Sequence, residues 1–162
     1  FFLDVYTCSR NDKKNGTIER VVGDTVLLCN YSDQYKKETI QGFKWLNENG
    51  TISDFESVNG LLTRLTASID TTKEIRTLFN SKHTHIFVAA FRAFTELGYG
   101  DSEFGKFLNW FIDGGSETEI DGESWNELGA DRSTRDSGVV HKKLDYLVAL
   151  MGRYFEEIRK AA

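Results

Sequence analysis

The feature that most constrains the fold is an apolar repeat near the end of the chain. In the stretch DRSTRDSGVVHKKLDYLVALMGRYFEEI, residues 131–158, apolar residues recur in alternating steps of four and three, at Val140, Leu144, Leu147, Met151, Tyr154 and Ile158. This heptad-like spacing places them on one side of an α-helix. We predict a helix from about residue 134, with Ser133 or Thr134 as its N-cap and Asp136 in its first turn.

Helical spacing also covers most of the chain from residue 51 onward. Residues 53–70, 71–81, 83–97 and 102–112 each carry apolar side chains three and four positions apart. The first of these helices is expected to be capped by Ser53 or Asp54. We therefore predict a mainly α fold, a compact helical bundle. Its core is expected to contain Phe87, Phe91, Phe94, Phe107, Leu108, Phe111, Leu144, Leu147 and Met151.

Residues 17–31 fit two structures. Their β-branched side chains and the pair Gly23-Asp24 are typical of a β-hairpin. The same stretch also groups four apolar residues on one face of a helix: Ile18, Val22, Val26 and Cys29. Helix is favoured, and the hairpin stays open. We divide the chain into residues 1–50, a segment of uncertain structure packed on the bundle, and residues 51–162, the helical domain.

Composition limits the partners of this chain. Its net charge is −5, from 25 acidic and 20 basic residues, and this balance disfavours non-specific binding to nucleic acid or to anionic membranes. No apolar run approaches the ~20 residues of a membrane span. We predict no membrane partner, and the oligomeric state is left open.

The two cysteines indicate the cellular compartment of the protein, and the first residue indicates whether the chain is a fragment. Cys8 and Cys29 form no C-x-x-C pair, which favours a reduced, cytoplasmic protein. The alternative is a secreted domain with a Cys8–Cys29 disulfide, because Asn15, Asn30 and Asn49 each begin an N-glycosylation triplet. The chain begins at Phe1 without an initiator methionine, so we expect a fragment or a processed form.

Catalytic motifs are absent from the sequence, so no catalytic residue, cofactor or metal is assigned and enzymatic activity is left undecided. His83 and His85 would point ~160° apart on a helix, which favours a surface pair over a shared metal. Residues 113–131 hold seven acidic residues and four glycines, and we predict a solvated loop with one helical turn around Trp125. The loop lacks the spacing of an EF-hand calcium site.

A basic cluster provides the candidate site. Arg132, Arg135, His141, Lys142 and Lys143 lie within twelve residues of an otherwise acidic chain. In one interpretation they simply surround a helix start in solvent. In the other they form a face that binds phosphate groups or an acidic partner, and we take them as the candidate binding residues.

The stretch SWNELGADRSTRDSGVVHKKLDYLVALMGRYFEE resembles the C-terminal helical region of a family of bacterial and phage proteins. These proteins carry an N-terminal ParB-like domain with a DGQQR motif, and the GmrSD modification-dependent restriction systems belong among them. The resemblance covers about the last forty residues, through an acidic-aromatic turn, an S/T-K/R-D element, a Val-rich helix start and a Leu-Met helix. The matching positions are Ser133, Thr134, Arg135, Asp136, Val139, Val140, Leu144, Leu147 and Met151.

The resemblance implies a domain without the catalytic part of the family, because DGQQR and any HNH nuclease motif are missing. The first hypothesis is a non-catalytic helical domain of a ParB-like restriction or defence protein that contacts nucleic acid or a neighbouring domain. The alternative is a stand-alone interaction module, such as a phage-encoded inhibitor or adaptor, whose acidic surface binds a basic protein.

Overall fold

The computed structural model describes residues 1–8, 16–35, 39–134 and 136–158. It confirms the mainly α fold. The helices are α2 (Thr17–Asn30), α3 (Thr39–Asn49), α4 (Ile52–Ser68), α5 (Lys73–Arg76), α6 (Thr84–Glu96), α7 (Asp101–Ile112) and α8 (Ser137–Arg153). Short 3-10 turns η1 (Ser32–Gln34) and η2 (Gly115–Glu117) follow α2 and α7, and a π-helical turn η3 (Tyr154–Ile158) continues α8.

Regular strands do not occur in these described ranges, where the only β pairing is an isolated bridge between Ile120 and Glu123. The same residues contain no helix with the length and apolar character that crossing a bilayer requires.

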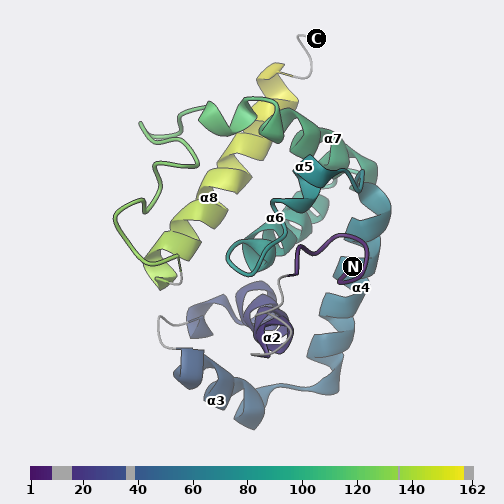
Figure 1. The fold of residues 1–162 in the computed structure, drawn as a ribbon, viewed down its shortest axis with the longest axis vertical. Helices are drawn as coiled ribbons and strands as arrows, with labels where there is room; N and C mark the ends of the chain where they lie inside the picture. Colours follow the sequence, from purple (N-terminus) through teal and green to yellow (C-terminus); the bar gives the residue numbers. More distant parts are fainter. Residues whose placement is uncertain (9–15, 36–38, 135, 159–162) are drawn as a thin grey trace.

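The core of the bundle forms around α6. Figure 1 shows α6 in the middle of the molecule, with α8 on one side and α4 on the other. Eight of the nine predicted core residues are almost fully buried, and the ninth, Leu144, is partly buried against the same cluster. The helical periodicity of the sequence therefore identified the centre of the core correctly.

Most of residues 17–31 form the helix α2, which ends at Asn30, and the hairpin alternative is not realised. Gly23, expected to allow a turn, lies inside α2, where a Cβ atom would come within 2.8 Å of the Phe43 ring of α3. The glycine thus permits close packing of two helices instead of a chain reversal. Val26 and Leu27 of α2 are buried in the same apolar cluster as α6.

The first residues pack on the turn that follows α5. The backbone N–H of Thr7 donates to the carbonyl of Phe79 at 2.8 Å, and the Phe1 ring meets the Phe79 ring edge-on at 5.6 Å between centroids. These contacts join residues 1–8 to the turn after α5, and α2 packs on α6 in the apolar cluster. The predicted division at residue 50 stays a prediction.

Helix starts differ from the predicted caps by a few residues. Thr51, not Ser53 or Asp54, caps α4 in a capping box, in which the Thr51 backbone N–H donates to Asp54 at 2.9 Å. Asp136, not Ser133 or Thr134, caps α8 by accepting from the backbone N–H of Gly138 at 2.9 Å. A cap side chain accepts from the backbone N–H two or three positions later: Thr51 accepts from Asp54, and Asp136 accepts from Gly138 and Val139.

Candidate functional site

The predicted acidic loop, residues 113–131, lies against α8. Tyr146 of α8 donates from its hydroxyl to the carbonyl of Thr118 at 2.7 Å, and Arg153 donates to the carbonyl of Glu119 at 3.0 Å. Glycines with positive φ allow its sharp turns, among them Gly122 (84°) and Gly129 (65°). We call residues 113–131 the acidic loop, which is held on α8 by these hydrogen bonds.

Trp125 anchors this loop in the core. Its side chain is only 6% exposed and packs against the rings of Phe87 at 5.3 Å and Phe111 at 5.6 Å between centroids. Its backbone N–H donates to the carbonyl of Ser116 at 3.2 Å. A bulky aromatic residue inside an acidic, glycine-rich stretch was the sequence signal for such an anchor.

The structure separates the five predicted binding residues. Arg132 and Lys142 are exposed, and Arg135 lies outside the described residues. His141 is half-buried, with its ring edge-on to Tyr35 at 6.3 Å. Lys143 is only 8% exposed and lies in the interior, so it does not join the predicted basic face. Successive residues of a helix differ in direction by about 100°, which sends Lys142 outward and Lys143 inward.

Lys143 forms a partly buried contact with His83 and Trp125. Its Nζ lies 3.1 Å from His83 Nε2 and 4.6 Å from the centroid of the Trp125 ring. Burial, then the charges of Lys143 and Lys82, lower the pKa of His83 to about 4. Burial also lowers the pKa of Lys143. The neutral imidazole of His83 therefore accepts a hydrogen bond from the Lys143 ammonium, while the indole face stabilises the cation.

The prediction of a surface histidine pair is wrong. His85 is buried, and its Nε2 lies 3.1 Å from the hydroxyl of Tyr35, with the two rings stacked at 5.3 Å. His83 and His85 do contact different partners, because His83 meets α8 and the acidic loop. Both lie at the start of α6, where that helix packs into the core, and this packing could not be read from their spacing.

A groove runs between the acidic loop and α8. It consists of two adjoining pockets of about 430 and about 260 Å³, which share Glu123 and Lys142 in their linings. Ile120, Leu128 and Tyr146 provide apolar lining. The charged lining residues are the carboxylates Asp121, Glu123, Glu127, Asp131 and Asp145 and the cations Arg132 and Lys142.

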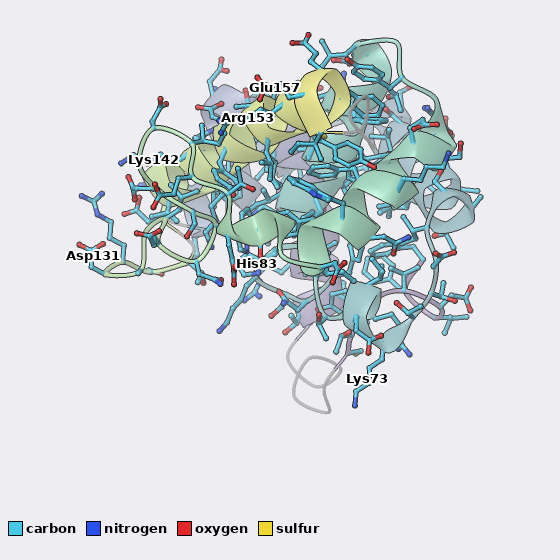
Figure 2. The ribbon with its side chains drawn as sticks, turned by 90° about the horizontal axis from the view of Figure 1, so that it is seen from above. Lys73, His83, Asp131, Lys142, Arg153 and Glu157 are labelled. Carbon is cyan, nitrogen blue, oxygen red and sulfur yellow. The ribbon has the colours of Figure 1, made fainter. Side chains whose placement is uncertain are left out.

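We call this feature the acidic groove, because five carboxylates and only two cations line it. Figure 2 shows Asp131 and Lys142 at the side of the molecule where the acidic loop lies, with His83 closer to the middle. Thus two of the predicted basic residues belong to a site whose overall charge is negative. Sequence reasoning missed its carboxylates because Asp145 comes from α8 and the others from the loop.

The described residues contain no group of three or more His, Cys, Asp or Glu side chains that could hold a metal ion. Cys8 and Cys29 are not joined by a disulfide, and burial raises the pKa of the Cys29 thiol to about 12. The side-chain amide of Asn30, one of the glycosylation triplets, is engaged inside the protein. It donates to Asp54 at 3.1 Å and accepts from Arg92 at 2.7 Å.

No family model matches this chain, and neither curated proteins nor solved structures gave a match. The resemblance to the ParB-like restriction family stays a prediction.

Proposed function

We propose that this chain is a non-catalytic helical interaction domain whose acidic groove binds a basic segment of a partner protein. The proposal rests on the lining of the groove, which combines five carboxylates with the apolar side chains of Ile120, Leu128 and Tyr146. Lysine and arginine side chains complement this arrangement, since their charged ends pair with carboxylates and their aliphatic stems cover apolar surface.

The two cations of the groove give it selectivity. Lys142 is shared by both pockets, and Arg132 lies in the smaller one. A bound segment would avoid placing its own cations beside them, because like charges repel at an interface. We infer that the partner segment alternates basic and apolar or acidic residues, in preference to a uniform lysine run.

Nucleic acid is the less favoured ligand for this face. Phosphate binding depends on an excess of positive charge, and here Arg132 and Lys142 are outnumbered by their acidic neighbours. The ParB-like hypothesis also allowed contact with a neighbouring domain, and that form of it is compatible with an acidic groove. A basic surface of such a domain would occupy the same groove.

The proposal includes a cytoplasmic location, where thiols stay reduced. The high pKa of Cys29 fits a buried, unreactive thiol in that setting.

The experiment is a binding titration with a fluorescent peptide of mixed lysine, arginine and leucine, compared with an acidic peptide and a DNA duplex. We expect the basic peptide alone to bind, with an affinity that falls as salt rises. The triple variant Glu123→Gln, Glu127→Gln, Asp145→Asn should weaken binding about tenfold, since each rim charge contributes about 0.2–1 kcal/mol.

A matched control removes the same charges elsewhere. Asp33→Asn, Glu48→Gln and Glu56→Gln lie on exposed positions of η1, α3 and α4, and together they should leave binding nearly unchanged. The double reversal Arg132→Glu, Lys142→Glu should strengthen binding of the basic peptide. An equal effect of both triple variants would refute a specific groove, and salt-sensitive duplex binding lost on the reversal would favour nucleic acid instead.

A further inference from the structure

The contact among His83, Lys143 and Trp125 joins three separate parts of the fold. His83 precedes the first turn of α6, Lys143 belongs to α8, and Trp125 belongs to the acidic loop. The rings of His83 and Trp125 lie 5.4 Å apart, and the Lys143 ammonium approaches both. His83, which can be protonated, thus contacts both elements that line the acidic groove, α8 and the acidic loop.

This contact requires a neutral His83. Its Nε2 faces the Lys143 ammonium at 3.1 Å, and an ammonium can only donate. If Nε2 of His83 were protonated, two N–H donors would face each other, and the positive charges of His83 and Lys143 would repel. The charged groups that face His83 are Lys143 from α8 and Lys82 in the preceding turn, both cations, and the acidic loop faces it with the uncharged indole of Trp125.

The position of Trp125 connects this contact to the groove. Glu123 and Glu127 lie two residues to either side of it, and both line the groove. Lys142, shared by both pockets, is the direct neighbour of Lys143 in α8. Displacement of Trp125 or of the start of α8 therefore moves the carboxylates and the cation that define the proposed binding surface.

We propose that His83 is a proton-operated latch: its protonation expels Lys143 from the shared contact, releases Trp125 and rearranges the acidic groove. The latch is closed at neutral pH, where the low pKa of His83 keeps the imidazole uncharged, and it opens in acid. Regulation of partner binding by this latch rests on the proposed function, whereas the movement of Trp125 does not.

The test follows the indole N–H signals of Trp45, Trp110 and Trp125 in ¹H–¹⁵N NMR spectra from pH 7 to about pH 3, with the imidazole signals of His83, because the pKa of about 4 leaves His83 only half protonated at pH 4. We expect the Trp125 signal to shift in step with protonation of His83, while Trp45 and Trp110 stay in place. In His83→Gln, whose amide oxygen can still accept from Lys143, the Trp125 signal should not respond. A Trp125 signal that stays fixed while His83 titrates would overturn the latch, and so would a concerted shift of all three indoles.

A second pair of variants keeps the test decisive if His83→Gln does not fold. Lys143→Met removes the facing cation but keeps an unbranched side chain, and should raise the pKa of His83 and abolish most of the Trp125 shift. Lys82→Met removes the other facing charge, which does not contact Trp125, and should leave that shift in place. Equal effects of both variants would contradict the geometry. Failure of the basic peptide to bind at pH 7 would contradict the proposed function, but it would not affect the expected pH-dependent shift of the Trp125 signal.

Discussion

The two halves of α8 are buried in different ways. The C-terminal half contributes Leu147, Leu150 and Met151, all fully buried among apolar side chains of the core. The N-terminal half also buries the apolar Val139 and Val140, but it adds Lys143, whose ammonium contacts one imidazole and one indole. One helix thus contains both a general apolar contact and a specific polar one.

The two kinds of burial should respond differently to substitution. Apolar burial is stabilised in proportion to the area removed from water, and it tolerates side chains of similar volume. A buried cation is stable only with its partners in place, because desolvation is costly without them. We therefore expect large losses from reduced volume at the apolar positions of the C-terminal half, and losses that depend on pH and on partner identity at Lys143 in the N-terminal half.

The largest effect is expected from Leu147→Ala. The side chain is fully buried, so the truncation should lower the free energy of unfolding by about 2–5 kcal/mol through lost contacts and the cavity left behind. Chemical denaturation measures it. Leu97→Ala is the control, because that side chain is 59% exposed and should change stability by less than about 0.5 kcal/mol. Similar values for both would place this half of α8 outside the core.

Lowering the pH should first destabilise the contact between His83 and Lys143 in the N-terminal half of α8. The pKa of His83 falls from 6.5 in the unfolded chain to about 4 in the folded one, so the unfolded chain binds more protons between these values. Stability should therefore fall as pH falls from 6.5 to 4, by up to about 3 kcal/mol at 1.36 kcal/mol per pKa unit.

Denaturation at a series of pH values measures this loss, and His83→Gln should flatten the profile in that window. Asp54 and Asp101 also have lowered pKa values, but their contribution is lost only below 3.8. An unchanged profile in His83→Gln would contradict the role of His83. A loss that levels off early would indicate that the acidic loop opens before the domain unfolds.

Two neighbouring lysines provide the smallest contrast. Lys143→Ala removes a cation–π contact and leaves His83 Nε2 without its donor, and should cost about 1–3 kcal/mol. Lys142→Ala removes an exposed side chain and should stay within about 0.5 kcal/mol. Thermal unfolding at neutral pH measures the stability of both variants and is sufficient to distinguish these two costs. Equal costs would mean that the buried contact adds nothing to stability.

Much of the fold followed from periodicity alone, because apolar residues at helical spacing must share a face. The helix over 17–31 could not be decided in that way, since the packing of Gly23 against Phe43 depends on a neighbouring helix. Helix caps were misplaced by two or three residues for a similar reason. Several Ser, Thr and Asp residues compete locally, and only backbone geometry selects among them.

The site was harder to predict, although one signal was available. Lys143 occupies the buried seam of α8, three residues after Val140 and four before Leu147, both of which are fully buried. Grouping basic residues by sequence proximity ignored that spacing. The acidic groove needed information that the sequence does not provide, because it forms only when the loop folds back on α8.

The His83–Lys143 contact has an evolutionary consequence. It connects positions sixty residues apart, and neither side chain is well suited to its environment without the other. Selection would therefore act on the two positions as a pair: drift at either one leaves an uncompensated polar group in the interior. A lineage that replaced both with apolar side chains would keep the bundle and give up its sensitivity to protons.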